Sequence, residues 1–455
     1  MEKTLIFSSA NDVRLGKLFR FIVPTYLTSL FNTLYTMVDG IFVSSYVGTN
    51  ALAAINIVYP IVNILTGIAL IFGTGGSAVA AILIGAQKRA EANRAFSVSA
   101  LASLFLGCLV SLVMIGNLTG MLNFLGATEL TINDCRAYAL WWLFGAPLVI
   151  CKELFTYFIR VDGSPTYSFL TALSGGICNI ILDYILVAQC NFGIHGAAAA
   201  TIMGLLVSTC MGIFYFLFRK KQLTFTVHGL KIPLGIRCMV NGVSEFVDQL
   251  AIAITTIVFN RTAMTFAGED GIAAVSIIMY LQFLVIGVYF GVSMGIAPPL
   301  GYAYGEKNQS VCRALERYAY RFFLGSPLLL YGATFLLAPL GVSFFAASES
   351  PVYDLAVVGM RLYGLGFLFS GINIFSAIRF MAYGKGYLSG IITFLRSFSL
   401  LLLFLLTLPG FWGINGVWLA VPFAEGCTIL ISVLLIGMEV RKIRLCTPRG
   451  PKNTT

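Results

Sequence analysis

The sequence has little charge for its length. Only 11% of its 455 residues are Asp, Glu, Lys or Arg, whereas 58% are hydrophobic, and the mean hydropathy is +0.90. A water-soluble domain usually carries roughly 25% charged residues, because its surface faces water. A soluble fold of this size has no means of hiding so much apolar side chain. The composition therefore excludes a soluble protein and predicts a chain that lies in a lipid bilayer.

Histidine and paired cysteine are scarce as well. There are two histidines, and the ten cysteines are scattered singly, without the close spacing of metal sites. This excludes a soluble redox or zinc enzyme. A Gly-Lys-Ser/Thr phosphate-binding loop is missing, so ATP is not the expected energy source and no cofactor is expected. A basic face interleaved with aromatic residues is also missing, so nucleic acid is not an expected partner.

Long apolar windows dominate what is present. A bilayer core about 30 Å thick requires roughly 20 apolar residues per helix. Twelve windows qualify, at about residues 18–46, 52–84, 96–117, 138–159, 167–189, 195–218, 236–266, 272–304, 318–340, 358–380, 388–408 and 412–437. The sequence therefore predicts an all-α polytopic membrane protein with twelve transmembrane helices.

The basic residues predict the orientation of these spans. With both termini inside, most Lys and Arg residues lie in the segments that face the cytoplasm, including the stretch from Arg219 to Arg237. Cytoplasmic segments carry such an excess in multi-pass proteins. We therefore expect both termini in the cytoplasm and a location in the plasma (inner) membrane. The net charge of +10 is then a signal of topology.

An internal repeat divides the chain. At an offset of 220 residues, Gly48 aligns with Gly268, and Gly193-Ile-His-Gly aligns with Gly413-Ile-Asn-Gly. Because six spans separate equivalent residues, the repeat is parallel, as in transporters whose two halves rock around a central site. This predicts two pseudo-symmetric six-helix bundles at 1–218 and 238–440, a cytoplasmic linker at 219–237 and a basic cytoplasmic tail at 441–455.

Several motifs resemble those of one transporter family. They are Val38-Asp-Gly-Ile-Phe-Val43, Val47-Gly-Thr-Asn-Ala-Leu-Ala-Ala54, Arg160-Val-Asp-Gly-Ser-Pro165, Asn179-Ile-Ile-Leu-Asp183, Gly193-Ile-His-Gly-Ala-Ala198, Gly291-Val-Ser-Met-Gly-Ile-Ala-Pro298 and Tyr304-Gly305. In this order they resemble the multidrug and toxic compound extrusion (MATE) transporters, in the branch of the MepA and DinF-type exporters. The resemblance implies two six-helix lobes around a V-shaped cleft, and export driven by Na⁺ or H⁺ without enzymatic chemistry.

Two acids of the first half form the strongest candidate site. An ionisable side chain at the middle of a bilayer costs on the order of 2.5–3.5 kcal/mol, so such a residue is expected to be functional. Asp39 ends a polar stripe that includes Asn32 and Tyr35 on one helix face, and Asn179 and Asp183 share a face of the fifth span.

Two carboxylates with amide and hydroxyl oxygens suit a hard cation such as Na⁺, or they can share and release a proton. We therefore expect cation coupling at Asp39, Asn179 and Asp183. The resemblance adds Thr201 and the backbone of Ala197 to this site. The alternative is that Asp183 pairs locally with Lys152 or Arg160.

A second acidic face lies on the seventh span, where Glu245, Asp248 and Gln249 are candidates for attracting a cationic substrate, together with Asn32 and Tyr35 of the first span. The alternative is that the two acids pair with Arg396. Glu245 matches a membrane glutamate of the NorM-type relatives. However, Asn373 stands where those relatives carry an aspartate, which places a cation site in the second lobe in doubt.

Two other acids lie within predicted spans. Glu153 is expected to pair with the adjacent Lys152, and whether Glu425 faces the cleft stays open.

The sequence thus predicts a monomeric antiporter that exports small, amphiphilic organic cations in exchange for Na⁺ or H⁺. A lipid-linked glycan flippase is one alternative, but it should have a strongly basic cleft, and only Lys152 and Arg396 are basic deep within spans. An intramembrane aspartyl enzyme is the other alternative, with Asp39 and Asp183 as its acid pair.

Overall fold

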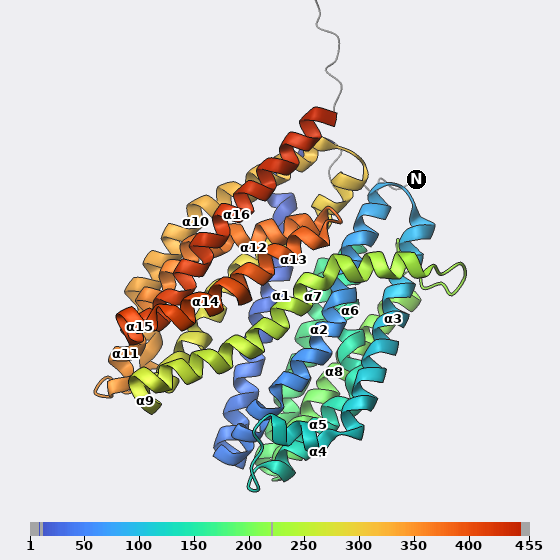
Figure 1. The fold of residues 1–455 in the computed structure, drawn as a ribbon. Coiled ribbons are helices and arrows are strands. Elements are labelled where there is room, and N and C mark those ends of the chain that lie inside the picture. Colours follow the sequence, from blue (N-terminus) through green and yellow to red (C-terminus); the bar gives the residue numbers. More distant parts are fainter. Residues whose placement is uncertain (1–8, 10–11, 220–221, 447–455) are drawn as a thin grey trace, which may run out of the picture.

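The computed structural model describes residues 9, 12–219 and 222–446, and its regular elements in this part of the chain are helices (Figure 1). The elements of the first half are α1 (Leu15–Phe42), the π-helical turn η2 (Val43–Val47), α2 (Thr49–Gly85), α3 (Arg89–Gly116), α4 (Leu118–Phe124), α5 (Ile132–Phe144), α6 (Ala146–Val161), α7 (Pro165–Asp183), the π-helical turn η3 (Tyr184–Gln189) and α8 (Gly193–Phe218).

The second half begins with a pair of helices that meet at the non-helical Gly268 and are together named α9. Its elements are α9 (Ile232–Gly305), α10 (Gln309–Ser343), α11 (Pro351–Tyr363), the 3₁₀ turn η4 (Gly364–Gly366), α12 (Phe367–Ala382), α13 (Gly386–Phe394), the π-helical turn η5 (Leu395–Ser399), α14 (Leu400–Thr407), α15 (Pro409–Trp412) and α16 (Ile414–Cys446). In Figure 1, α2–α8 gather on one side and α10–α16 on the other, while α9 passes across both groups. We call α1–α8 the first lobe and α9–α16 the second lobe.

The number of membrane spans is not confirmed as twelve. In the described residues, nine helices are long and apolar enough to cross a bilayer, or ten if α5 and α6, which meet at a bend of 53°, form one span. The 74-residue α9 counts once, although it contains two predicted windows and is broken by the non-helical Gly268. The predicted lobe boundaries also stay a prediction, and residues 447–455 of the predicted tail lie outside the described residues.

Unusual backbone conformations recur at the spacing of the repeat. Residues with positive φ occur in pairs 220 residues apart, namely Gly48 with Gly268, Gln87 with Lys307 and Gly193 with Gly413. The left-handed region is sterically costly for most residues. Chain reversals of the same kind therefore end corresponding helices in the two lobes, as expected for a duplicated six-helix unit.

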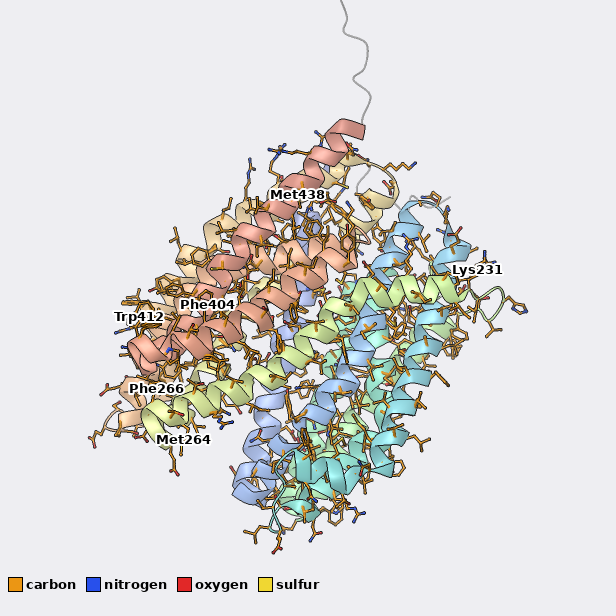
Figure 2. All side chains as sticks on the ribbon, in the orientation of Figure 1. Lys231, Met264, Phe266, Phe404, Trp412 and Met438 are labelled. Atoms are coloured by element: carbon orange, nitrogen blue, oxygen red, sulfur yellow. The ribbon has the colours of Figure 1, made fainter. Side chains whose placement is uncertain are left out.

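The outer surface of both lobes is apolar. Large side chains such as Phe266, Trp412 and Met438 are exposed (Figure 2), and leucines along α10 are exposed in the same way. Exposed apolar area of this extent is unfavourable in water, whereas acyl chains accommodate it. The structure is therefore that of a multi-pass membrane protein.

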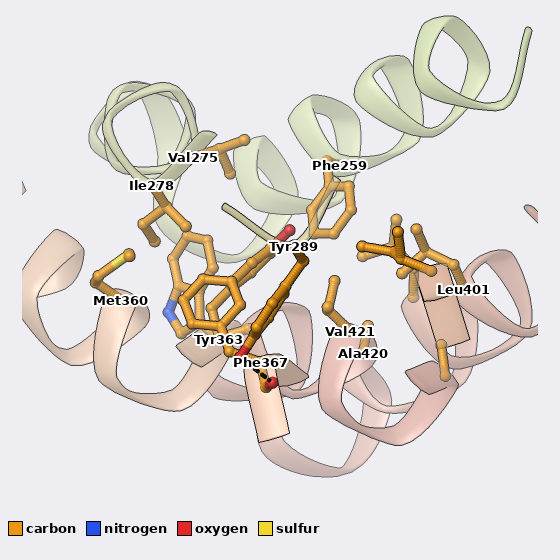
Figure 3. Close-up of a cluster of buried hydrophobic side chains, with 14 of the residues drawn as sticks. Phe259, Val275, Ile278, Tyr289, Met360, Tyr363, Phe367, Leu401, Ala420 and Val421 are labelled. Atoms are coloured by element: carbon orange, nitrogen blue, oxygen red, sulfur yellow. Dashed lines mark hydrogen bonds between the residues drawn. The ribbon is translucent and has the colours of Figure 1, made fainter. Parts of the chain in front are cut away.

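Each lobe has its own core. In the second lobe, α9, α11, α12 and α16 enclose a cluster that includes Phe259, Tyr289, Phe367 and Val421 (Figure 3). Elsewhere in this lobe the buried Arg379 forms ion pairs with Glu316 and Glu439, the latter at 2.5 Å, so that three helices are joined by charge. The aromatic cluster and the ion pairs together fix the helices of this lobe.

The two lobes meet closely at one end, through glycines. A Cβ atom on Gly242 of α9 would lie 1.9 Å from the carbonyl oxygen of Ile71 on α2, so these helices touch backbone to backbone. Gly85 approaches the backbone of Tyr302 in the same manner, and the repeat-related Gly305 approaches Ile82. Only glycine permits such an approach. The contact is thus itself two-fold symmetric.

Hydrogen bonds reinforce this contact. The Tyr302 hydroxyl donates to the backbone oxygen of Val161, and the Asn241 amide donates to the backbone oxygen of Gly75 at 3.3 Å. Cys238 and Tyr302 belong to the second lobe, yet both are buried in a cluster formed mostly by first-lobe side chains. Separating the lobes at this end would therefore expose both residues.

The segment between the lobes is bound to the first lobe. Buried Asp162 accepts hydrogen bonds from the backbone amides of Gln222 and Leu223, at 2.9 and 2.8 Å, and from the Tyr215 hydroxyl. Further along, the Thr226 amide donates to Ser97. These bonds lay the connecting segment along α3 and the turn between α6 and α7.

Candidate functional site

The strongest candidate site lies between α1 and α7 of the first lobe. The carboxyl groups of Asp39 on α1 and Asp183 on α7 lie close enough to interact with each other. Their helices pack so closely that a Cβ atom added to Gly176 would lie 2.4 Å from the Phe31 ring. Asp183 is completely buried, and Asp39 is half-buried. The two acids that the sequence singled out are therefore neighbours.

Several oxygens at this site lack partners. Within the described part of the chain, both carboxyl oxygens of Asp183, one of Asp39 and the amide oxygen of Asn179 are buried and make no hydrogen bond. Buried polar groups are nearly always paired, because an unpaired one costs about 1–3 kcal/mol. Such a set of oxygens is suited to binding a cation or a proton.

The α8 side of the site supplies the remaining predicted residues. The Asn179 amide donates to the Thr201 hydroxyl at 3.4 Å, and this hydroxyl donates to the backbone oxygen of Ala197 at 3.1 Å. A Cβ on Gly204 would touch the Asn179 side chain, so glycine again sets the helix spacing. The structure thus brings Asp39, Asn179, Asp183, Thr201 and Ala197 to one place.

The alternative pairing of Asp183 with a basic residue is wrong for this structure. Lys152 binds the adjacent Glu153 at 2.5 Å, as predicted for that acid. Arg160 donates through Nε to the Ser168 hydroxyl at 3.3 Å and lies over the Tyr157 ring. In the described residues, no ion pair reaches either acid of the site. No basic side chain of the described residues therefore neutralises the acid pair.

Three tyrosines near the site were not predicted. Tyr138 on α5 is buried within electrostatic reach of Asp39 and Asp183. Tyr59 on α2 is 46% exposed, yet it lies within reach of Tyr35 on α1 and of Tyr280 on α9 of the other lobe. Because tyrosine is frequent in this sequence, the presence of tyrosine does not mark these three positions as parts of a site. Tyr59 and Tyr280 thus bring aromatic rings of the two lobes near each other.

The second lobe carries a mixed group of charges. Glu245 and Asp248 lie one turn apart on α9 and interact electrostatically, and Asp248 accepts a hydrogen bond from the Ser397 hydroxyl at 2.6 Å. Arg396 does not form an ion pair with either of them, contrary to the alternative reading, but binds Glu425 at 3.0 Å. Glu425 is buried beside Arg396.

The remaining candidates lie on α1 and α9. Asn32 and Tyr35 are half-buried on α1, and Gln249 follows Asp248 on α9, where its Cβ lies 3.6 Å from a Cβ built on Gly67 of the other lobe. All three lie on helices that adjoin the opposite lobe.

The two lobes differ at the position of the acid pair. Counted 220 residues on, Asp39, Asp183 and Thr201 correspond to Phe259, Leu403 and Val421. Phe259 and Val421 are buried in the apolar cluster of Figure 3. At these three positions the first lobe is polar and the second lobe is apolar.

Comparison with known families agrees with this architecture. The MatE family profile matches residues 24–185 and again residues 246–406, once in each lobe. The chain belongs to the MatE family. Members of this family are transporters, so the expectation of a membrane transporter rather than an enzyme is confirmed. The two matches also account for the repeat, because each lobe is one copy of the family unit.

Among curated MatE relatives, two staphylococcal proteins cover nearly the whole chain. The multidrug export protein MepA of Staphylococcus saprophyticus is 24% identical over 453 residues, which cover 96% of each protein. MepA of Staphylococcus haemolyticus is 23% identical, covering 91% of this chain and 92% of the relative. The predicted resemblance to MATE transporters of the MepA-like branch is thereby confirmed.

Solved structures of the same fold align along the whole chain. An outward-facing multidrug resistance MATE transporter of the MOP superfamily aligns with a TM-score of 0.89 at 23% identity, covering 96% of this chain and 98% of that one. A MOP superfamily transporter from Pyrococcus furiosus aligns with a TM-score of 0.88 at 23% identity and the same coverage. At this identity the similarity establishes the MATE fold.

Proposed function

We propose that this MATE transporter exports small, amphiphilic organic cations in exchange for Na⁺ or H⁺ by alternating access. One observation carries the coupling part of the proposal, namely the buried oxygens of Asp39, Asp183 and Asn179 that lack hydrogen-bond partners. A transmembrane site with unpaired carboxylates is unfavourable unless a cation or a proton occupies it. Release and rebinding of that ion would then be tied to movement of the lobes.

The chemistry of the site fits either ion. Na⁺ is a hard cation that takes oxygen ligands, and the carboxylates can supply them together with the amide of Asn179 and the hydroxyl of Thr201. A proton would instead be shared between the two carboxylates, because like charges at short range do not both ionise readily. In either case, the ion compensates one of the two negative charges and so lowers the electrostatic repulsion between α1 and α7.

Alternating access follows from the contact between the lobes. With both termini in the cytoplasm of a cell whose plasma membrane the protein spans, the glycine contact of Gly85, Gly242 and Gly305 lies at the cytoplasmic end. The described conformation is then closed toward the cytoplasm. The similarity to an outward-facing MATE structure is consistent with this orientation. In the transport cycle, the contact opens and the opposite end closes.

The substrate class follows from charge and aromatic rings. Glu245 and Asp248 lack a basic ion-pair partner among the described residues, so the second lobe offers negative charge to a substrate. Tyr35, Tyr59 and Tyr280 supply aromatic faces from both lobes, and such faces attract cations. The names of the curated relatives, multidrug export proteins, agree with a lipophilic small-molecule substrate. A complete two-lobe unit is sufficient for this cycle, so we propose that a monomer transports.

A lipid-linked glycan flippase fits less well. It would need free basic side chains to hold pyrophosphate, but Lys152 and Arg396 are each bound to a neighbouring glutamate. The available driving force is sufficient for the antiporter. One monovalent ion that crosses 100 mV supplies about 2.3 kcal/mol, enough for a solute gradient of a few tens-fold.

The test is transport of radiolabelled tetraphenylphosphonium, a lipophilic monovalent cation, in proteoliposomes with an imposed Na⁺ gradient or pH gradient. We compare the wild-type protein with Asp39→Asn and with Glu269→Gln, which neutralises an exposed acid of the second lobe. We expect one gradient to drive transport in the wild type and in Glu269→Gln, and no coupled transport in Asp39→Asn. Coupled transport that survives Asp39→Asn would refute the proposed site, and its absence from the wild type would refute the proposed substrate class.

A further inference from the structure

A buried ion pair in the second lobe has no role in the proposed coupling. The guanidinium of Arg396 binds one carboxyl oxygen of Glu425 through Nε at 3.1 Å and through Nη2 at 3.0 Å. The side chain of Glu425 is 5% exposed and that of Arg396 is 16% exposed. Breaking a buried pair by removing one partner is costly, because the other charge stays buried and uncompensated.

Glu425 is held in place from its other side. The amide of Asn373 on α12 donates to the second carboxyl oxygen of Glu425 at 2.7 Å and to its backbone oxygen at 2.9 Å. The Ser432 hydroxyl in turn donates to the Asn373 amide oxygen at 2.9 Å. Asn373 and Ser432 are both completely buried. The carboxylate is therefore a fixed anchor, and the position of Arg396 follows from it.

Arg396 also lies near the acids of α9. It belongs to the π-helical turn η5, together with Ser397, which donates to Asp248 at 2.6 Å. Arg396 interacts electrostatically with Asp248, and Glu245 interacts electrostatically with Arg396. Turns of this kind are frequent at functional sites because they redirect side chains. Here the turn places the Arg396 guanidinium within electrostatic range of three carboxylates, and the guanidinium binds one of them, that of Glu425.

This arrangement determines what Glu245 and Asp248 can bind. A desolvated guanidinium is unfavourable unless it is paired with a carboxylate. Without Glu425, Arg396 would therefore pair with one of the two acids of α9 and neutralise it. We propose that Glu425 holds Arg396 away from Glu245 and Asp248, which makes the Arg396–Glu425 pair a determinant of selectivity for cationic substrates. This inference rests on the proposed function, because it assumes that the second lobe receives the substrate cation.

The repeat supports a role that is special to the second lobe. The positions that correspond to Arg396 and Glu425 in the first lobe are Gly176 and Leu205. The pair is therefore not part of the duplicated helix packing. The Arg396–Glu425 pair belongs to the lobe in which Glu245 and Asp248 stay available to bind the substrate.

The test exploits opposite effects of the two partners. Glu425→Gln releases Arg396, which then competes with the substrate, whereas Arg396→Gln removes that competitor and frees a third acid. We expect the KM for tetraphenylphosphonium to rise on the order of tenfold in Glu425→Gln and to fall severalfold in Arg396→Gln. These are the effects of one unit charge about 10 Å away at an effective dielectric constant of about 20. The double variant, with the same net charge as the wild type, should return to within about threefold of the wild-type KM.

Further measurements separate this role from a structural one. The concentration of coupling ion that gives half-maximal transport should stay unchanged in all three variants, because the acid pair of the first lobe is untouched. A merely structural pair predicts that both single substitutions impair transport in the same direction, and that result overturns the inference. It is likewise overturned if KM is unchanged in Arg396→Gln, a variant that tests the idea even where Glu425→Gln fails to fold. Absence of tetraphenylphosphonium transport by the wild-type protein would instead reject the proposed function.

Discussion

Gly242→Ala should shift this transporter away from the described conformation. The added Cβ would lie 1.9 Å from the Ile71 carbonyl oxygen and 2.9 Å from the Gly75 backbone nitrogen, while contacts under 3.0 Å essentially never occur. Because the obstructing atoms are backbone atoms of the other lobe, the helices themselves must separate. The substitution therefore acts as a wedge between the lobes.

The size of the effect follows from the cost of overpacking. Inserting one methyl group into a close-packed contact costs about 1–3 kcal/mol. This cost falls on the closed state alone, because the open state separates α2 from α9. The ratio of open to closed molecules should then rise roughly 5- to 150-fold, at 1.4 kcal/mol per factor of ten.

Cys238 is a natural reporter of this equilibrium. It is 0% exposed and packs among first-lobe side chains, so it becomes accessible when the lobes part at this end. We expect its alkylation by N-ethylmaleimide, followed by peptide mass spectrometry, to be on the order of tenfold faster in Gly242→Ala. Cys135, buried in the core of the first lobe, provides an internal reference whose rate should not change.

The matched control is Gly287→Ala in the part of α9 that follows the break at Gly268. A Cβ there meets nothing within 4 Å, so the substitution gains the same helix propensity without a clash. Equal acceleration of Cys238 alkylation in Gly287→Ala would refute the wedge argument. An unchanged rate in a folded Gly242→Ala protein would do so as well.

Three further outcomes follow from hydrogen bonds and ion pairs described above. Tyr302→Phe removes the hydrogen bond to Val161 and should accelerate Cys238 alkylation by a few-fold, in line with about 0.5–1.5 kcal/mol for one such bond. Asp162→Ala should speed proteolytic cleavage of the connecting segment at least tenfold, because that segment loses two of its backbone anchors; cleavage at the wild-type rate would contradict this. Arg379→Gln leaves Glu316 without a basic partner, while Glu439 keeps its ion pair with Lys385, and should lower the free energy of unfolding by about 3–5 kcal/mol. The measurement is thermal unfolding in detergent, and an unchanged transition would show that the ion pairs of Arg379 are not stabilising.

The sequence singled out two acids that the structure places side by side. Asp39 and Asp183 were recognisable because carboxylates are rare in apolar spans, and the i, i+4 spacing placed Asn179 on the same face as Asp183. The family resemblance leads one to expect contact between α1 and α7, whereas the residue spacing does not. Periodicity shows which side chains share one face of a helix, but not which other helix packs against that face. The repeat was visible because glycines mark its chain reversals.

Other parts of the site depend on packing between distant helices. The alternative in which Arg396 pairs with an acid of α9 is wrong for this structure, because Arg396, in the π-helical turn η5, binds Glu425 of α16. Tyr138 lies near the acid pair because α5 meets α6 at a bend of 53° at Gly145. A hydropathy pattern does not reveal such a bend. The predicted windows at 236–266 and 272–304 match the two parts of α9 on either side of the non-helical Gly268, and the number of twelve spans stays a prediction.

The bound connecting segment has a consequence for how the polypeptide can be divided. Residues 222–226 stay with the first lobe through Asp162 and Ser97, so the stretch from Val227 to Lys231 alone bridges to α9. The exposed turn at Gly229, with φ of 67°, lies in this stretch. A chain cut there would leave two fragments, each with a complete set of core helices. The two lobes are thus connected by one short exposed segment. Co-expressed halves should therefore reassemble through the glycine contact.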